Sequence, residues 1–525
     1  MATTVNKPAV TLNIIGEQSE VANTEQKILV FGQKLGGTAT AGVLVADVQL
    51  GDLDSVFGNY STIADMVRNI RKYNTVNSID VMPFADGTLQ AEATIEVTSV
   101  AGVTAATTFY ISVGSQTDHR TSVDVSVGDT VTTVAASIVA AINAMNTGAS
   151  LCPFTASNML GVVTITCEQA GVIGNSMSAK LEVPANSGIT FDLTAFSGGT
   201  DSLDLDAYFS SIVSRYQTVV WPFSNNSTNL KEVSDWLETR INADRKVLDG
   251  QAFASTIVTT DDLTTVINSR TLTVLASKLV ANPDSDLAIG ADICEKEYAK
   301  AAQVAAINAL RLTDDASLTR FQTTVAPADQ FGGMGISTLP YFNTLLPLMP
   351  KSNSYGYTET EQDTLTDKGY SFIGNVPNGS SVVIGDLRTT YGFDSGGNPD
   401  DSWVSLNNVV AMSAAREYFY NNLRKRFAQS RLTGGKTVAG RSVADQDIIE
   451  AYCSALNLDL GEVAVTEVGN TTVDGVLIDA GDFFNDNLTV TLDTGAGSVT
   501  INAVLLVVGQ LRTILGTLQL AFSNN

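Results

Sequence analysis

The 525-residue sequence has only one histidine, and its four cysteines are widely spaced. A single histidine cannot build a His-rich metal site, and cysteines without CxxC pairs indicate neither a zinc site nor a disulfide framework. We therefore expect buried free thiols, and we expect His119 to be a solvated residue of a polar turn rather than a general base. The cysteines are Cys152, Cys167, Cys294 and Cys453.

Long apolar runs and excess positive charge are also missing. The opening MATTVNKPAVTLNII lacks the charged and then apolar segments of a secretion signal, and AVLLVVG near the end is about a third of a membrane span. Acidic residues outnumber basic ones by 55 to 30, which gives a formal net charge of −25. This balance argues against nucleic-acid binding, which needs a basic surface. We expect a protein made in a cytoplasm, without membrane insertion or direct nucleic-acid contact.

Three short stretches resemble ligand-binding loops, but each is better explained as a turn or a helix start. GGKT at 434–437 ends like a phosphate loop, but Ser430 stands where the first glycine should be. DSLDLD at 201–206 lacks the glycine and closing glutamate of a calcium loop, so it predicts an acidic helix start. DSGGNPDD at 394–401 predicts a solvated turn, with cation binding as a weaker alternative. We expect no catalytic set, no cofactor and no metal.

Alternating strands and helices predict an α/β core with parallel strands and crossover helices. The predicted strands are 27–33, 78–84, 217–223, 251–258 and 271–277, and the predicted helices are 54–72, 205–216, 230–244 and 295–312.

A β-rich stretch interrupts this pattern. Between 85 and 200 the chain is rich in Thr, Val, Ser and Ala, with nine acidic and two basic residues, and alternating segments surround one predicted helix at 133–145. The sequence therefore predicts an α/β core, residues 22–84 and 200–395, with a β-rich insertion domain at 85–199. Residues 335–395 should be rich in loops, and short strands should return after 460.

A predicted helix at 408–428 ends in a basic cluster. Arg424, Lys425 and Arg426 surround its last turn, and Arg431 follows. Cations at a helix C-terminus are favourable by about 0.3–1 kcal/mol, so a structural role is one interpretation. An acidic partner surface is the other, and the sequence does not decide between them.

Arg416 differs from that cluster because helical spacing puts it on the apolar side of the same helix. A charged side chain there needs compensation. We expect it either to pair with a carboxylate or to reach across an interface.

Both chain ends alternate apolar and polar residues as half-buried strands do. A strand needs a partner, and an unpaired apolar edge promotes aggregation. The apolar positions are Val10, Leu12 and Ile14 near the start, and Ile514, Leu518, Leu520 and Phe522 near the end.

Residues 382–432, VVIGDLRTTYGFDSGGNPDDSWVSLNNVVAMSAAREYFYNNLRKRFAQSRL, resemble the conserved region of contractile tail sheath proteins. The ending INAVLLVVGQLRTILGTLQLAF, residues 501–522, is similar to the closing segment of Mu-like phage (myovirus) sheaths. The matching residues of the first region are Arg388, Thr389, Thr390, Tyr391, Gly396, Gly397, Asp400, Arg416, Leu423, Arg424 and Arg426.

The resemblance implies a structural virion protein that stacks in rings of roughly six copies around a tail tube. It implies N- and C-terminal arms, residues 1–21 and 512–525, whose strands complete a sheet in neighbouring copies. Residues 396–511 would then form an α+β domain that faces the tube, with Arg416, Arg424, Lys425, Arg426 and Arg431 as candidate tube contacts.

The implied partners are other copies of the chain, the tail tube protein, and the baseplate and tail terminator proteins. Assembly would occur in the host cytoplasm, and contraction would drive the tube through the host envelope for genome ejection. The sheath of a phage-derived bacteriocin or injection machine is an open alternative. From other classes, a β-rich surface protein or adhesin and a hydrolase with an unfamiliar site remain.

Overall fold

The computed structural model describes most of the chain between residues 26 and 504. The described residues are 26–59, 61–114, 119–146, 152–200, 205–223, 227–241, 248–258, 266–278, 288–289, 296–314, 345–346, 357–375, 382–427, 430–432, 443–460, 463–467, 470–474, 481–493 and 498–504.

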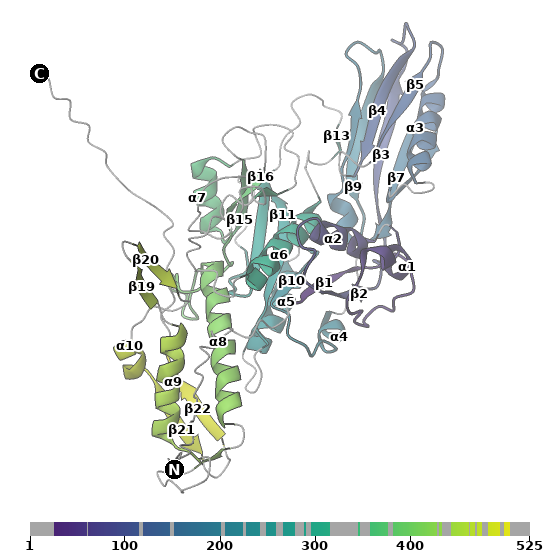
Figure 1. The fold of residues 1–525 in the computed structure, drawn as a ribbon. Coiled ribbons are helices and arrows are strands. Elements are labelled where there is room, and N and C mark those ends of the chain that lie inside the picture. The colour runs from purple at the N-terminus through teal and green to yellow at the C-terminus, as the bar shows by residue number, and fades with distance from the viewer. Residues whose placement is uncertain are drawn as a thin grey trace, which may run out of the picture.

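A mixed eight-stranded sheet forms the centre of the molecule (Figure 1). Its strand order is β14-β16-β15-β12-β11-β10-β1-β2. All pairs from β2 to β15 are parallel, whereas β16 and β14 are added antiparallel. The strands are β1 (Ile28–Gln33), β2 (Ile79–Phe84), β10 (Thr218–Val220), β11 (Gln251–Val258), β12 (Leu272–Lys278), β14 (Leu345–Leu346), β15 (Ser371–Asn375) and β16 (Val382–Asp386).

Helices cover both faces of this sheet, as parallel strands require. Every residue of β1 is buried, and its side chains alternate between the two faces. Gly32 faces α2, because a Cβ atom there would lie 2.6 Å from Met66. Phe31 faces the other way, toward Trp236 of α5. The helices are α2 (Thr62–Arg71) and α6 (Glu297–Asp314), which pack on each other, and α4 (Leu205–Phe209) and α5 (Ser227–Ile241).

Aromatic rings fill the carboxyl ends of the strands where the strand order reverses, between β1 and β10. Trp221 follows β10 directly, is fully buried, and lies 5.3 Å from Phe31 between ring centroids. Phe84, the last residue of β2, stacks on Phe223. Doubly wound sheets commonly bind ligands at this reversal point. In this chain the position is part of the hydrophobic core.

The predicted helix at 54–72 is wrong in one respect, because the structure divides it into α1 (Leu53–Phe57) and α2. Gly58 has a φ of 90°, a conformation that ends a helix. Ser61 then caps α2 by accepting a hydrogen bond from the Ala64 amide at 3.2 Å. A short 3-10 turn, Leu50–Asp52, precedes α1.

The segment between β2 and α4, here called the inserted segment (β3 to β9), supplies all four strands of one antiparallel sheet and three of the four strands of another (Figure 1). Phe109 and Phe191 join the two sheets with ring centroids 5.3 Å apart. The predicted helix at 133–145 is α3 (Val131–Met145), and a second 3-10 turn spans Val172–Ser176. The strands are β3 (Gln90–Ser99), β4 (Thr107–Val113), β5 (Arg120–Val125), β6 (Phe154–Met159), β7 (Val162–Ala170), β8 (Ala179–Glu182) and β9 (Thr190–Ser197).

The inserted segment is held to the central sheet by more than its two connections. The connections run side by side, since the Thr88 amide donates to the Thr200 carbonyl at 2.8 Å. Gly87 sits against Gly171 so closely that a Cβ atom would lie 2.4 Å from its backbone. In addition, β13 (Ala288–Ile289), from the chain between β12 and α6, pairs with β8. Sequence alternation does not anticipate this last pairing.

The long helix α8 (Leu406–Phe427) leads to a smaller C-terminal unit, defined as the described residues from 415 to 504 (Figure 1). Buried apolar residues there form two clusters separate from the central core. The remaining elements are β17 (Arg431–Leu432), β18 (Val443–Ala444), α9 (Gln446–Leu460), β19 (Val463–Glu467), β20 (Asn470–Asp474), α10 (Gly481–Asp486), β21 (Thr489–Asp493) and β22 (Ser498–Asn502).

Two other predicted stretches differ from the structure, and one helix was not predicted. The predicted helix at 205–216 is only the five-residue α4, because Arg240 donates to the Ile212 carbonyl and holds the following chain in a bend. The loop-rich stretch 335–395 contains α7 (Glu359–Asp367), which begins with a Thr358 and Glu361 capping box. Helix α9 was not predicted from the sequence at all.

Candidate assembly site

Helix α8 carries four of the five predicted tube-contact residues, and the structure separates them into two environments. Arg424, Lys425 and Arg426 lie together on its last turn and are exposed. The Arg426 guanidinium is 5.9 Å from the Phe427 ring centroid. Arg431 lies on β17, four residues beyond the helix, and its side chain is outside the described residues. The structure therefore presents one exposed basic end of α8.

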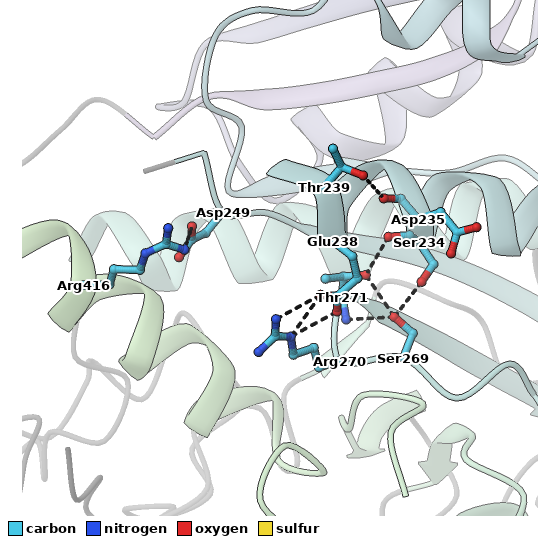
Figure 2. Close-up of polar contacts among 9 residues, drawn as sticks. All are labelled: Ser234, Asp235, Glu238, Thr239, Asp249, Ser269, Arg270, Thr271 and Arg416. Atoms are coloured by element: carbon cyan, nitrogen blue, oxygen red, sulfur yellow. Dashed lines mark hydrogen bonds and ion pairs between the residues drawn. The ribbon is translucent and has the colours of Figure 1, made fainter. Parts of the chain in front are cut away.

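Arg416 lies higher on α8 and pairs within the chain. Its Nη1 atom is 2.8 Å from Oδ1 of Asp249, just before β11 (Figure 2). The Asp249 side chain is only 8% exposed. Burial raises the pKa of Asp249, while the guanidinium groups of Arg416 and Arg215 act in the opposite direction. Of the two expectations for Arg416, the structure supplies the carboxylate partner.

A second ion pair of opposite polarity lies beside the first. Arg215, from the bend before β10, pairs with Glu417 of α8, and both side chains are about one-sixth exposed. Arg215 also donates to Ser413 Oγ at 3.1 Å, and Gln217 lies 3.5 Å from Glu417. Sequence reasoning missed Arg215, because the helix predicted at 205–216 gave no reason to bring it to α8. The two pairs form what we call the α8 junction: Arg215, Asp249, Ser413, Arg416 and Glu417.

The Arg-Thr-Thr-Tyr segment before α8 is held in place by its own side chains. Thr389 Oγ1 donates to the Trp403 carbonyl at 2.6 Å, and Thr390 Oγ1 donates to the Ser269 carbonyl at 3.1 Å. Arg388 donates to the Thr366 carbonyl at 3.0 Å. These bonds connect the chain before α8 to the last turn of α7, through Thr366, and to the residues just before β12, through Ser269. The segment is thus a structural clamp between the central sheet and α8.

The turn at 394–401 is a solvated, self-bonded loop, as predicted. Asp394 accepts hydrogen bonds from the Gly396 and Asn398 amides, both at 2.8 Å. Asp400 accepts from Ser402 and from the Tyr391 hydroxyl, at 2.7 Å for the latter. The hydrogen bond to Asp400 raises the pKa of Tyr391 to about 12. The carboxylates therefore serve the turn itself.

A second polar network, around Arg270 (Figure 2), meets the same clamp at Ser269 and Trp403. Arg270 donates to both carboxylate oxygens of Glu238 on α5, at 3.0 and 2.9 Å, and its guanidinium lies 5.2 Å from the Trp403 ring centroid. Ser234 donates to Ser269 at 2.7 Å in the buried space nearby. Planar, bidentate arginine pairs of this kind fix orientation as well as charge.

The hairpin of β21 and β22 packs on the helices of the C-terminal unit. Val490 is buried and packs with Leu492, Val499 and Ile501 against α8 and α9, while Thr489 and Thr491 point outward. Within the described ranges, every sheet of this unit has just two strands. The terminal strands predicted at Val10, Leu12 and Ile14, and at Ile514, Leu518, Leu520 and Phe522, lie outside the described residues, as does GGKT at 434–437.

The prediction of a solvated His119 is wrong. This residue is 7% exposed, because it precedes β5 in the hairpin with β4, and its carbonyl accepts from the Val113 amide at 3.0 Å. Cys152, Cys167 and Cys453 are buried free thiols, as expected, and Cys294 lies outside the described residues. Burial raises the pKa of Cys152 and Cys453 to about 11.

No group of three or more His, Cys, Asp or Glu side chains in the described ranges is arranged to hold a metal ion. Across the same ranges, no helix combines the length and the apolar character needed to cross a membrane.

These features define a mixed α/β protein in which one long helix, α8, leads from the central sheet to the C-terminal unit. No protein-family model matches the chain. The chain is 23% identical over 456 residues to the Mu-like prophage FluMu tail sheath protein of Haemophilus influenzae, and the match covers 84% of each sequence. This match confirms the resemblance to Mu-like tail sheath proteins.

Solved structures give weaker similarities of the same kind. A sheath tail protein from Desulfitobacterium hafniense is 9% identical with a TM-score of 0.38, covering 94% of this chain and 99% of that one. The helical sheath of the anti-feeding prophage in its contracted state is 12% identical with a TM-score of 0.41, covering 94% and 93%.

Proposed function

We propose that this chain is the structural subunit of a contractile tail sheath, which polymerises around a tail tube and contracts to drive the tube through a host envelope. The observation that carries the proposal is the match to a Mu-like tail sheath protein over 84% of both sequences. A match of that extent covers most of both sequences. The role is structural, and no catalytic residue, cofactor or metal forms part of it.

Neighbouring subunits are joined by exchanged strands in this proposal. Isolated two-stranded ladders are only marginally stable, and the described part of the C-terminal unit is built from such ladders. A strand from another copy would extend the β21–β22 hairpin by β-augmentation. The alternating residues of 8–16 and 512–522 suit this role, since backbone hydrogen bonds and one buried apolar face would both be satisfied.

Contraction needs no fuel molecule in this account. The sheath would assemble extended, in stacked rings of roughly six copies, and a baseplate signal would release the lowest ring. Contacts between subunits would then increase ring by ring, and the buried surface would supply the free energy at about 25 cal/mol per Å². The mature particle would be a phage tail assembled in the host cytoplasm, with baseplate and terminator proteins at its ends.

The basic end of α8 is proposed to contact the tube, and the inserted segment to face outward. Arg424, Lys425 and Arg426 are exposed, so their contacts with an acidic tube surface would be weak enough to break on firing. Changing all three to Glu should weaken assembly templated by the tube and spare assembly without it. Equal loss of both forms in a sedimentation assay would instead indicate a folding role for these cations.

Negative-stain electron microscopy of the purified protein tests the central claim. Tubes with a regular helical lattice are expected, and a compact monomer at every concentration would refute the sheath proposal. Imaging of the native particles that contain this chain separates the two alternatives: a capsid would identify a phage tail, and its absence a phage-derived injection machine.

A further inference from the structure

Helix α8 passes through three different environments along its length. Its first residues, Leu406 and Val410, belong to the hydrophobic core of the central sheet. Its second half, including Tyr418 and Leu423, packs into the separate clusters of the C-terminal unit. The α8 junction lies where these two parts of the helix meet, around Ala415, which already belongs to the C-terminal clusters, and its described contacts with the central body are polar. One rigid helix therefore connects two apolar bodies through a polar middle.

The junction is built from two ion pairs that run in opposite directions. The central body contributes a cation and an anion, Arg215 and Asp249, and α8 contributes an anion and a cation, Glu417 and Arg416. Each side is therefore neutral as a whole, and the attraction depends on register. Sliding or rotating α8 would bring like charges together, which is unfavourable by Coulomb's law.

Partial burial makes each pair strong when complete and costly when broken. Asp249 is 8% exposed, whereas its partner Arg416 is 37% exposed. Removing one member of such a pair leaves the other charge uncompensated in a poorly hydrated position. An apolar contact lacks this all-or-none character, because it weakens in proportion to the area lost.

The start of α8 supplies a fixed pivot for any movement. Thr389 is held at two points: its amide donates to the Val404 carbonyl, and its hydroxyl donates to the Trp403 carbonyl. The Thr390 amide donates to the Leu272 carbonyl at 2.9 Å. Release of the junction would thus let the helix tilt about its first turn while the chain stays attached.

We propose that the α8 junction is an electrostatic latch that sets the angle between the central sheet and the C-terminal unit. With both pairs closed, the C-terminal unit is held in the observed orientation. With the pairs open, α8 pivots at its core-packed first turn and carries the C-terminal unit to another orientation. The latch belongs to the single chain and does not depend on the sheath proposal.

Hydrogen exchange measured by mass spectrometry on the full chain, below its assembly concentration, tests the latch. Arg416→Met and Asp249→Asn should each speed exchange in residues 411–420 by about 10-fold. The double variant should exchange no faster than the faster single one, since each change breaks the same pair. Additive effects, or no effect of either change, would overturn the proposal. Amides of α2 report global unfolding in the same experiment.

A matched control and a variant-free measurement complete the test. Arg120→Met breaks an exposed ion pair with Glu182 in the inserted segment and should leave α8 exchange unchanged. If the junction variants fail to fold, the unmodified chain still decides the matter. Raising the salt from about 0.05 to about 1 M shortens the screening length from well over 10 Å to about 3 Å. Partly buried pairs are screened less than exposed ones, but Arg416 is 37% exposed. Exchange in 411–420 should therefore rise modestly while α2 stays protected, and no rise would refute the latch.

Discussion

At the scale of single residues, Lys296, just before α6, forms a partly buried ion pair with α2, in which Lys296 is 14% and Asp65 30% exposed. Its Nζ atom is 3.2 Å from Asp65 Oδ2 and 5.6 Å from the Tyr298 ring centroid. Burial alone would lower the pKa of Lys296, but the Asp65 carboxylate and Tyr298 outweigh it and raise that pKa well above its usual value. Burial would likewise raise the pKa of Asp65, but Lys296 holds it below the usual value.

Replacing Lys296 by Met should lower the free energy of unfolding by about 1–3 kcal/mol, because Asp65 would lose its charge partner. Denaturant unfolding of the full chain measures this loss. Arg120→Met, which removes an exposed pair, should cost less than about 1 kcal/mol. Equal losses for the two variants would mean that burial of Lys296 adds nothing to the pair.

The same pair predicts a pH dependence with a definite sign. The folded pKa of Lys296 lies above the ordinary 10.5, so its stabilising contribution is complete below 10.5 and is lost as pH rises through the higher folded value. The folded pKa of Asp65 lies below 3.8, so its contribution is present above 3.8 and is lost as pH falls through the lower folded value. The unfolding midpoint of the Lys296→Met variant should therefore fall much less at alkaline pH than that of the unmodified chain. An equal fall in both would contradict a stabilising charge on Lys296.

At the scale of elements, Gly58 decides how α1 ends. Its φ is 90°, and a Cβ atom would lie 1.6 Å from the Leu35 carbonyl oxygen. Gly36 offers a matched control, because its φ is 80° but nothing lies within 4 Å of a Cβ atom there.

Gly58→Ala should therefore destabilise the chain by clearly more than Gly36→Ala, which carries only the backbone cost of about 1 kcal/mol. The difference between their thermal unfolding midpoints measures the steric part. Similar midpoints would show that the Leu35 loop yields without cost.

Periodicity predicted the elements whose burial repeats along the sequence. Strand β1 is a nearly continuous apolar run, and α3 and α8 show clear helical spacing. The split between α1 and α2 was missed because Gly58 acts through the local backbone rather than through the apolar pattern. Helix α9 had a readable signal, since Asp445 accepts from the Ile448 amide at 2.9 Å as an N-cap. The pairing of β13 with β8 had no signal in the sequence, because a strand of two residues is too short to show alternation.

At the scale of the whole molecule, the candidate site depends on distant parts of the chain meeting. The sequence predicted that Arg416, on the apolar side of its helix, needs a partner. It could not identify that partner, because Asp249 lies 167 residues away. Its neighbour pair, Arg215 and Glu417, was missed for the same reason. The exposed basic end of α8 needed no such partner, so sequence and helical geometry were enough to predict it.

Deleting residues 512–525 should leave a folded protein that no longer forms long tubes, because the C-terminal strand would be lost to neighbouring copies. Analytical ultracentrifugation and electron microscopy measure this outcome, and circular dichroism checks the fold. Tubes of normal length from the shortened chain would refute strand exchange by this arm.

The two connections between the inserted segment and the central sheet run side by side, and an antiparallel β-bridge joins them at Leu89 and Thr200. Its two ends are therefore already within the reach of a tight turn. Another domain with closely spaced termini would therefore fit in its place, and β2, β10 and their helices would keep their positions. Variation in this segment would then change that surface of the protein and leave the central sheet as it is.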